Sequence, residues 1–425
     1  MVQAVRGMRD VLPLEARRWQ TVEHTVLRVL RAFAYEEIHL PLLEFTELFA
    51  RGVGEATDIV EKEMYTLADR DGDSLSLRPE GTASCVRALS EHGLLYNQTQ
   101  RVFYSGPMFR YEKPQKGRYR QFYQIGAEAF GFAGPDIDAE LILLAHACWQ
   151  ALGLRDHVRL ELNTLGASSA RQAYREALVA YLMPRASDLD SDSRRRLQTN
   201  PLRILDSKVE KTRALLEEAP RLSEYVDADS QAHFSRLLEM LEEAGVDVRL
   251  NPNLVRGLDY YTHTVFEWVT DDLGAQGTVC AGGRYDGLVA QLGGRATPAA
   301  GFAMGIDRVV LLHETVHQQQ PRAAVDLYVC YSVEALSAAG HFSEAARREP
   351  GGLRVRQHMG GGNFKKQLKR ADASGARWAA LIGENELAAN AVTLKDLKSG
   401  QQETLSESAA LERIRSVDRS HEQER

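Results

Sequence analysis

The feature that most constrains the fold is a pair of strand-like runs joined by a very short polar stretch. RVFYSGPMFRYE (101–112) and YRQFYQIGAEAFG (119–131) are separated only by KPQKGR. Both runs are rich in aromatic residues, and the residues between them are typical of a turn. The pattern predicts a β-hairpin.

Further elements are predicted on both sides of this hairpin. Residues 14–33 carry apolar side chains at helical spacing, and Pro13 stands just before them, where a proline is well tolerated. Residues 74–89 predict a strand, a turn and a helix. Residues 136–152 predict an amphipathic helix with Asp136 as its N-cap.

The character of the sequence changes along the chain. From about residue 169 to 245 charged helical patterns dominate and glycine nearly disappears, which indicates a helical insertion. Strand patterns and glycines return between 254 and 313. The polar stretch HQQQPRA (317–323) indicates a linker. Residues 324–425 alternate strand-like and helical runs, as a small α/β domain does.

Composition excludes several classes of protein. The chain has 425 residues, 44% of them hydrophobic, which suits two or three globular domains that need no disulfide or metal for stability. The four cysteines are scattered without a C-x-x-C pair, so we expect reduced thiols and no metal held by a protein cluster. No signal peptide and no run of about 18 apolar residues is found, which predicts a cytoplasmic protein that does not enter a membrane.

The hairpin carries a local basic patch. The whole chain has a net charge of −7, which argues against a uniformly basic coat for nucleic acid. Residues 101–120 nevertheless contain six Lys or Arg and a single acid, Glu112, for a local charge of +5. Such a loop attracts polyanions, either nucleotide phosphates or an RNA backbone. A solvated basic turn is the alternative interpretation.

The second hairpin strand has one polar face. Because side chains alternate across a strand, Phe122, Gln124, Gly126 and Glu128 share a face, and the residues between them form an ordinary core face. Glycine in a strand often marks the close approach of a ligand. A small polar molecule lying over Gly126, between Gln124 and Glu128, is one interpretation, and a solvent-facing sheet surface is the other.

Two later segments add candidate ligand contacts. Gly282 and Gly283 follow a strand-like run, where the backbone can approach a ligand or make a tight turn, but the sequence matches no phosphate loop. GFAMGIDRVVLL (301–312) leads from a small-residue strand into a helix with Arg308 in its first turn. A cation opposes the helix dipole there, so Arg308 indicates either a bound phosphate or a surface salt bridge.

LVRGLDYYTHTVFEW (254–268) combines an arginine, an aspartate and two adjacent tyrosines with a strand-like run. If the strand begins at Leu258, alternation sends Tyr260 and Tyr261 to opposite faces. Both tyrosines then reach one pocket only if the backbone departs from regular pleating near Gly257, or if one of them reaches it from the rim.

Together these segments resemble the histidyl-tRNA synthetases of bacterial type, a family of class II aminoacyl-tRNA synthetases. The likeness covers nearly the whole chain, starting at RGMRDVLP. LRPEGT (77–82) is similar to the family's substrate strand, residues 106–131 to its second class motif, and GFAMGIDRVVLL to its third. LVRGLDYY and AGGRYDG are similar to the two histidine-specific signatures, and LVRGLDYY is the more specific of the motifs.

The resemblance implies an α+β fold. Its core would be the class II synthetase sheet, six- or seven-stranded and antiparallel, flanked by helices. The implied catalytic core spans 1–168 and 251–318, a helical insertion 169–250, a linker 319–323, and an α/β anticodon-binding domain 324–425. The family also forms homodimers through its first motif, here around residues 40–60.

The resemblance also implies roles for individual residues. Arg110 and Arg256 are the candidate catalytic cations at the α-phosphate of ATP. The implied ATP-binding residues are Arg110, Glu112, Arg118, Phe122 and Arg308. The implied histidine-binding residues are Glu80, Gly81, Thr82, Arg110, Gln124, Glu128, Arg256, Tyr260 and Tyr261, with Glu128 and Tyr261 at the imidazole. The implied tRNA contacts are Lys113, Gln115, Lys365 and Lys366, although a solvated helix face explains the last two equally well.

The implied activity is ATP-dependent ligation of L-histidine to tRNA(His) through a histidyl-adenylate, with release of AMP and pyrophosphate. ATP with Mg²⁺ would be a substrate, and no tightly bound prosthetic group is expected. A catalytically inactive, histidine-sensing regulatory paralogue is one rival, which the joint presence of Arg110, Arg256 and Arg308 opposes. A synthetase for another amino acid is a second rival, which LVRGLDYY and Glu128 oppose.

Overall fold

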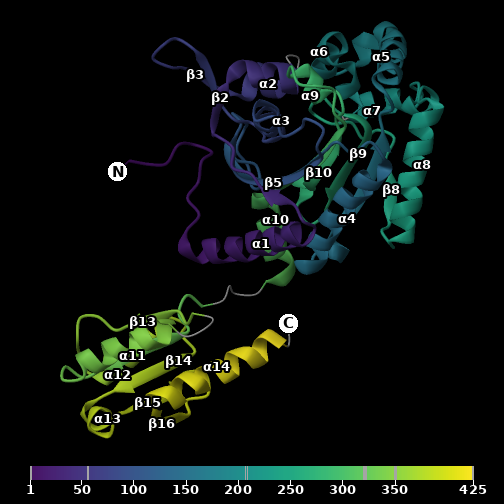
Figure 1. The fold of residues 1–425 in the computed structure, drawn as a ribbon. Coiled ribbons are helices and arrows are strands. Elements are labelled where there is room, and N and C mark those ends of the chain that lie inside the picture. Colours follow the sequence, from purple (N-terminus) through teal and green to yellow (C-terminus); the bar gives the residue numbers. More distant parts are fainter. Residues whose placement is uncertain are drawn as a thin grey trace. The chain divides into compact units, whose positions relative to one another are not determined.

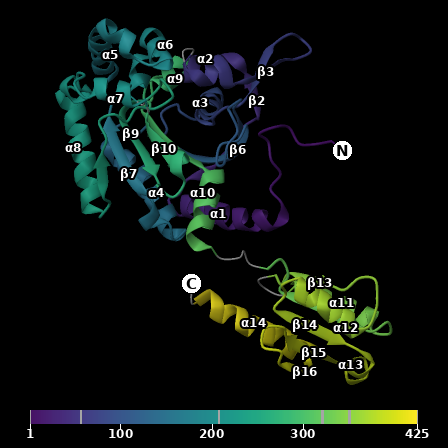
Figure 2. The ribbon, with the colours of Figure 1, turned by 180° about the vertical axis from the view of Figure 1, so that it is seen from behind.

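The computed structural model describes residues 2–54, 57–205, 207, 209–318, 323–348 and 352–423. The chain forms two compact units, Met1–Gln319 and Gln320–Arg425, each with its own hydrophobic core (Figures 1 and 2). The predicted linker at 319–323 lies, except for Ala323, outside the described residues. Within the described part of the chain, no helix has the length and apolar character needed to cross a membrane.

The larger unit is built on an eight-stranded sheet. In sheet order its strands are β1 (Glu36–Glu37), β5 (Gln100–Phe109), β6 (Gln121–Phe130), β11 (Ala299–Gly305), β10 (Thr278–Arg284), β9 (Thr262–Val269), β7 (Arg159–Thr164) and β8 (Val248–Leu250). The six inner strands pair antiparallel, which confirms the predicted fold class and the hairpin. The expected six or seven strands are an undercount, because β1 and β8 add a short parallel strand at each edge. Strands of two and three residues leave no periodic pattern in a sequence.

Successive side chains of the hairpin strands pack into two different cores, because they alternate between the two faces of the sheet. Phe103 packs into the core shared with α1 (Pro13–Ala32) and α4 (Pro135–Ala151). Its neighbour Tyr104 points to the other face, into a core shared with α3 (Thr82–Glu91) and the helical insertion. The helix predicted at 14–33 therefore forms, with Pro13 in its first turn. The face that carries Tyr104 also carries the candidate site described below.

Helix α4 differs from its prediction in two respects. Its N-cap is Gly134, and Asp136 lies inside the first turn, where no side-chain cap forms. The prediction of Asp136 as the N-cap is therefore wrong, although an acid in the first turn still favours the helix dipole. The helix is also not amphipathic, because the consecutive residues 137–139 are all buried.

The other elements of the larger unit are mainly helical. The helices are α2 (Thr46–Val53), α5 (Ser168–Leu182), α6 (Ser191–Thr199), α7 (Glu210–Leu216), α8 (Ala228–Glu243), α9 (Leu288–Gln291) and α10 (Ile306–His317). Short 3₁₀ helices lie at Arg155–His157, Met183–Asp188, Pro201–Ile204, Leu222–Glu224 and Gly274–Gln276, and a π-helical turn lies at Ile59–Glu63. Helices α5 to α8 form the teal group in Figure 1, which we call the insertion.

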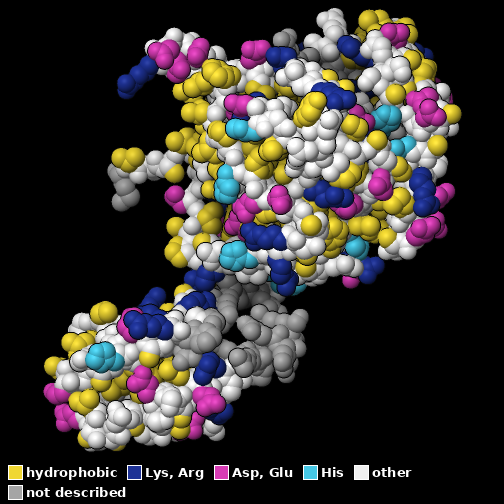
Figure 3. Space-filling model, viewed as in Figure 1, with side chains coloured by type: hydrophobic (Ala, Val, Ile, Leu, Met, Phe, Trp, Pro, Cys, Tyr) yellow, Lys and Arg dark blue, Asp and Glu magenta, His cyan; other side chains and the backbone are white. Residues whose placement is uncertain are grey.

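A second, small antiparallel sheet lies at the edge of the larger unit, with the order β2 (Leu43–Phe45), β4 (Ser74–Leu77) and β3 (Tyr65–Ala68). Several of its large apolar side chains, and the neighbouring Leu42, are exposed. Phe45 is 60% exposed, and Leu42, Leu43 and Leu67 are each 42–43% exposed. Figure 3 shows hydrophobic side chains gathered along this edge.

The smaller unit is a five-stranded mixed sheet with helices on both faces. Its strands, in sheet order, are β13 (Val355–Gln357), β12 (Leu327–Tyr331), β14 (Trp378–Ile382), β15 (Ala391–Asp396) and β16 (Gln402–Ser406). Its helices are α11 (Leu336–Arg348), α12 (Phe364–Ala373), α13 (Glu384–Ala389) and α14 (Glu407–Gln423). Helices α11 and α14 pack on one face and α12 on the other.

Candidate active site

A pocket of about 170 Å³ opens on the sheet face opposite α1 and α4. Its walls come from β6, β10 and β11, from α10, and from the segments before α3 and β9. Eleven of the residues singled out from the sequence line it: Glu80, Thr82, Arg110, Glu112, Arg118, Phe122, Gln124, Arg256, Tyr260, Tyr261 and Arg308. These residues lie far apart in the sequence, and the sheet brings them to one place.

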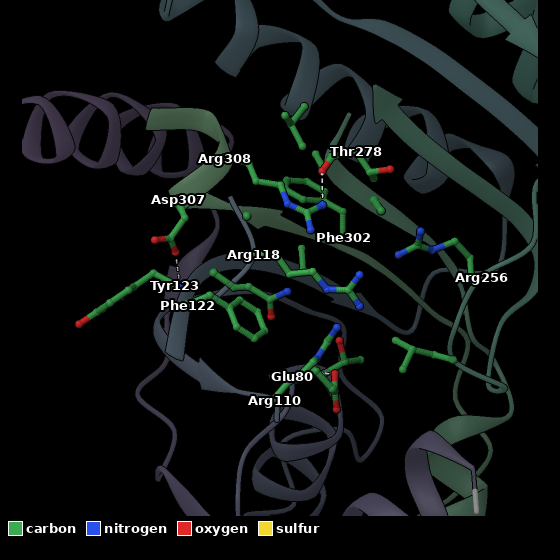
Figure 4. Close-up of a pocket in the computed structure, with 18 of the residues that line it drawn as sticks. Glu80, Arg110, Arg118, Phe122, Tyr123, Arg256, Thr278, Phe302, Asp307 and Arg308 are labelled. Atoms are coloured by element: carbon green, nitrogen blue, oxygen red, sulfur yellow. Dashed lines mark hydrogen bonds between the residues drawn. The ribbon is translucent and has the colours of Figure 1, made fainter. Parts of the chain in front are cut away.

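One end of the pocket is strongly cationic. Arg118, Arg256 and Arg308 point toward the same cavity from the hairpin turn, the segment before β9 and α10, and Arg110 enters it from the hairpin turn beside Glu80 (Figure 4). Burial, followed by the nearby charges of Arg118 and Arg110, lowers the pKa of Arg308 to about 10. A bound anion would relieve this crowding of like charges, so this end of the pocket is suited to phosphate.

Arg308 is held rigidly at this end. Its guanidinium donates to the carbonyl oxygens of Gly117 (3.0 Å) and Thr278 (2.8 Å) and to the side-chain oxygen of Gln276 (2.9 Å). Each of the three acceptors comes from a loop or strand end beside the first turn of α10. Arg308 therefore lies in the pocket wall and makes no surface salt bridge in the described structure. This favours the interpretation that Arg308 binds a phosphate over the interpretation of a surface salt bridge.

Two of the other arginines have carboxylate partners. Arg118 pairs with Glu112 across the hairpin turn, and Arg256 pairs with Glu267 on β9. Burial lowers the pKa of Arg256, but Glu267 and the tyrosines beside it outweigh this effect and the pKa is raised. Glu267 was not identified from the sequence. A lone carboxylate in an otherwise apolar part of a strand could have indicated that it pairs with a buried cation.

The opposite end of the pocket is built from neutral polar groups and buried carboxyls. The Glu80 carboxylate accepts from the backbone N–H groups of Thr82 (2.7 Å) and Ala83 (2.9 Å), at the start of α3. Burial raises the pKa of Glu80. Gln124 Oε1 is buried and has no hydrogen-bond partner among the described residues. An orphaned buried acceptor costs free energy, so a ligand that brings an N–H donor is favoured there.

Glu128 lies behind this end of the pocket and does not line it. Its side chain accepts from the hydroxyls of Thr82 (2.7 Å) and Tyr104 (3.2 Å), and Tyr285 donates to the other carboxylate oxygen. Burial raises the pKa of Glu128 to about 8, even though these hydroxyls lower it. Tyr104 and Tyr285 were not identified from the sequence.

The glycines of this region make room for protein side chains. A β-carbon on Gly126 would lie 2.2 Å from the ring of Tyr104, and one on Gly81 would lie 2.3 Å from the same ring. The interpretation of Gly126 as a seat for a ligand is therefore wrong, because Tyr104 occupies that space. Strand register was the available signal, since Tyr104 stands directly opposite Gly126 in the hairpin. Gly81 likewise does not line the pocket.

Tyr260 and Tyr261 both line the pocket, with ring centroids 4.7 Å apart. The sequence left two possibilities, a backbone that departs from regular pleating near Gly257 or a tyrosine at the rim. Because β9 begins only at Thr262, residues 257–261 are not part of a strand, which agrees with the first possibility. His263 then has a left-handed backbone, with φ of 49°, and the pairing of β9 with β10 shifts register there. Alternation across a strand therefore does not apply to the two tyrosines.

The four residues suggested as RNA contacts lie outside the pocket. Lys113 and Gln115 are exposed in the turn between β5 and β6. Lys365 and Lys366 are exposed on α12 of the smaller unit, where Asn363 caps the helix. The four cysteines are buried and unbonded, and Cys280 reaches the pocket wall from β10.

Comparison with known proteins gives the same assignment for both units. Residues 7–309 match the family model for histidyl-tRNA synthetase, and residues 309–417 match that for an anticodon binding domain. The chain is similar to the apo structure of histidyl-tRNA synthetase from S. aureus, with 34% identity and a TM-score of 0.80, covering 97% of this chain and 100% of that one.

Two more distant structures share the fold. Histidyl-tRNA synthetase from Nostoc sp. is 20% identical, with a TM-score of 0.73, and the match covers 97% of this chain and 99% of that one. A Bacillus halodurans protein described as an ATP phosphoribosyltransferase regulatory subunit/histidyl-tRNA synthetase is 23% identical, with a TM-score of 0.65, covering 90% of this chain and 98% of that one.

The buried carboxyl of Glu128 predicts a pH-dependent stability. Its folded pKa of about 8 lies above the ordinary value of 4.5, so the folded protein keeps a proton that the unfolded chain releases. The free energy of unfolding should therefore fall as pH rises between these values, by up to about 1.4 kcal/mol per pH unit. Glu128→Gln, which cannot ionise, should gain stability relative to wild type from pH 5 to pH 8 in urea unfolding. Glu176→Gln, at an exposed site, is the control. A stability difference between wild type and Glu128→Gln that stays constant with pH would contradict the prediction.

Proposed function

The chain belongs to the histidyl-tRNA synthetase family of class II aminoacyl-tRNA synthetases, and we propose that it ligates L-histidine to tRNA(His) with ATP, through a histidyl-adenylate. One observation carries the proposal. A single pocket joins a cationic end, formed by Arg118, Arg256 and Arg308, to a polar end that contains the orphaned acceptor of Gln124, and Arg110 lies beside Glu80 of the polar end. ATP fits the first end, and the amino group of an amino acid fits the second.

In the proposed first step, a carboxylate oxygen of histidine attacks the α-phosphorus of ATP. A new P–O bond forms as the bond to pyrophosphate breaks, which gives histidyl-adenylate and needs no protein nucleophile. Negative charge gathers at phosphorus, and Arg110 and Arg256 would stabilise it because their guanidinium groups are already in place. Arg118 and Arg308 would hold the distal phosphates, and Arg118 must then exchange Glu112 for a phosphate oxygen. Glu112 and Phe122 would contact the adenine.

Magnesium would enter as part of the MgATP substrate. Among the described residues no group of three His, Cys, Asp or Glu side chains is placed to hold a metal ion. The arginines therefore act beside whatever charge the nucleotide's own Mg²⁺ supplies, and the residues of the pocket serve to bind and orient the phosphates.

At the polar end, the amino group of histidine would donate to Gln124 Oε1 and to the nearby Glu80 and Thr82. Tyr260 and Tyr261 would enclose the imidazole. Glu128 is covered by the hydroxyls of Thr82, Tyr104 and Tyr285. A direct contact between Glu128 and the imidazole therefore requires that one of these hydroxyls release its carboxylate oxygen.

In the second step, the 3′-terminal hydroxyl of the tRNA would attack the acyl carbon of the adenylate, and the bond to the AMP phosphate would break. The exposed Lys113 and Gln115 in the hairpin turn would meet the acceptor stem. The exposed Lys365 and Lys366 would contact the RNA from the smaller unit, which matches the anticodon binding domain.

The rival function is histidine sensing without catalysis, as a regulatory paralogue. Such a protein needs the histidine end of the pocket but has no need of four arginines in the same cavity. The retention of Arg110, Arg118, Arg256 and Arg308 in one cavity favours the enzyme.

We also propose that the protein is a homodimer, joined through the edge that carries β2 and β3. Exposed large apolar side chains gathered on one surface are typical of a protein interface. Leu42, Leu43, Phe45 and Leu67 form such a group, in and beside the segment expected to hold the first class motif.

The function is tested by pyrophosphate exchange with each amino acid in turn, followed by aminoacylation of total tRNA. Exchange should depend on L-histidine, and only tRNA(His) should become charged. Exchange with a different amino acid, or histidine binding without exchange, would overturn the proposal, and the second result would establish the regulatory rival.

Arg256→His should slow adenylate formation about 10²–10³-fold, because the transition state loses about 3–4 kcal/mol of electrostatic stabilisation. The KM for histidine should change less than about threefold, since the other proposed histidine-binding residues remain. Stopped-flow or exchange kinetics give both values. Arg249→His, at an exposed position on β8, is the control. If the activation rate survives in Arg256→His, this residue only positions the substrate.

Phe45→Glu should convert the dimer to a monomer, because a charge cannot be buried in an apolar interface without a partner. Light scattering coupled to size-exclusion chromatography measures the mass. Met183→Glu, which changes an apolar residue of the insertion that is 52% exposed, should remain dimeric. A Phe45→Glu protein with dimeric mass would place the interface elsewhere.

A further inference from the structure

The segment that carries Arg256, Tyr260 and Tyr261 into the pocket is neither helix nor strand. Residues 251–261 lie between β8 and β9 without regular secondary structure. No sheet ladder fixes the part from 254 to 261, which we call the signature loop. Its position must therefore come from other contacts. Asn163 of β7 donates to the carbonyl of Leu254, Glu267 of β9 pairs with Arg256, and the insertion contacts the part around Asp259.

Arg171 of α5 makes the largest of these contacts. Its Nη1 donates to the carbonyl oxygens of Asp259 (2.6 Å) and Tyr261 (3.0 Å), and its Nη2 lies 3.5 Å from the Asp259 carboxylate. The two carbonyls stand on either side of Tyr260. One planar guanidinium thus fixes the backbone at the point where both tyrosines enter the pocket.

Two residues near the 3₁₀ turn Pro201–Ile204 continue this contact. Asn200 donates through Nδ2 to Oδ1 of Asp259 at 2.8 Å. An Nη atom of Arg203 lies 2.5 Å from the position that a β-carbon on Gly257 would take, so that glycine lets the guanidinium lie against the loop. The insertion therefore touches the signature loop on both sides of Leu258.

The loop is held from the opposite direction by α2. The N–H of Asp259 donates to the carbonyl of Val53 at 3.2 Å. A β-carbon on Gly54 would lie 2.9 Å from the Asp259 carboxylate. Asp259 is thus the point at which the loop is fixed between the catalytic core and the insertion, although its own side chain does not line the pocket.

We propose that Arg171 and Asn200 are positioning residues for adenylate formation. By fixing Asp259 and the two carbonyls, they hold the signature loop in the conformation that points Arg256, Tyr260 and Tyr261 into the pocket. Neither Arg171 nor Asn200 lines the pocket, so each acts only through the loop. The insertion is then part of the catalytic apparatus, and a displacement of α5 displaces the catalytic cation. The predicted effects on the rate of adenylate formation rest on the proposed function. The predicted effect on the conformation of the signature loop rests on geometry alone.

The first measurement does not depend on activity. Hydrogen exchange followed by mass spectrometry is compared for wild type, Arg171→Ala and Arg175→Ala, the last changing an exposed arginine one turn further along α5. In Arg171→Ala, amide exchange in the 254–261 peptide should speed up at least about tenfold, while peptides from β5 and β6 stay protected. Unchanged exchange in the loop, or equal changes throughout the larger unit, would overturn the proposal.

The second measurement separates positioning from general stability. Arg171→Ala should lower kcat of histidine-dependent pyrophosphate exchange about 10–100-fold, Arg171→Lys should recover part of the loss, and Arg175→Ala should match wild type. In the Arg256→His background, Arg171→Ala should lower kcat less than about twofold, because the cation it positions is gone. Full additivity of the two changes, or wild-type kcat in Arg171→Ala, would overturn the proposal. Absence of exchange in the wild-type protein would instead overturn the proposed function, and the loop measurement would still decide the positioning role.

Discussion

The cost of burying charge governs the arrangement of this molecule. The face of the sheet that carries the pocket brings several guanidinium and carboxyl groups out of water, and each buried charge must be given a partner. Arg308 has three oxygen acceptors, Arg256 has Glu267, and Arg110 donates to the carbonyl oxygen of Pro79. These partners keep the cations in one place before any ligand arrives.

The same constraint operates behind the pocket, where the sheet meets its supporting helices. Asp138 of α4 and Arg284 of β10 are both 1% exposed and form an ion pair at 2.7 Å. Burial would raise the pKa of Asp138, but hydrogen bonds from His233 and the charge of Arg284 lower it. His233 comes from α8 and Thr264, which also donates to Asp138, from β9. One carboxylate thereby joins a core helix, two central strands and the insertion, and removing one partner would leave an unpaired buried charge.

The sequence predicted the parts of the fold and site that depend on local patterns. The hairpin, the helix at 14–33 and the convergence of the motif residues followed from alternation, helical spacing and family resemblance. The two edge strands were missed because they are too short to be periodic. Asp136 was misplaced because Gly134 provides the extended residue before the helix. Tyr104 and Glu267 were missed because their roles arise from contacts across strands, and such contacts require the register of the sheet, which no single strand pattern fixes.

The adjacent tyrosines show how non-local contacts override local rules. A left-handed backbone is unfavourable for a residue with a β-carbon, so His263 requires compensation from its surroundings. Its N–H donates to the carbonyl of Gly166 at 2.8 Å, and its carbonyl accepts from Leu165 at 2.7 Å. Those two residues immediately precede α5, the helix that carries Arg171. The connection that leads into the insertion thus supports the irregular entry to β9, and the insertion itself holds the loop before it. The polar residues of LVRGLDYY are therefore not members of a strand with too many polar groups, but of a loop whose shape is set by another part of the chain.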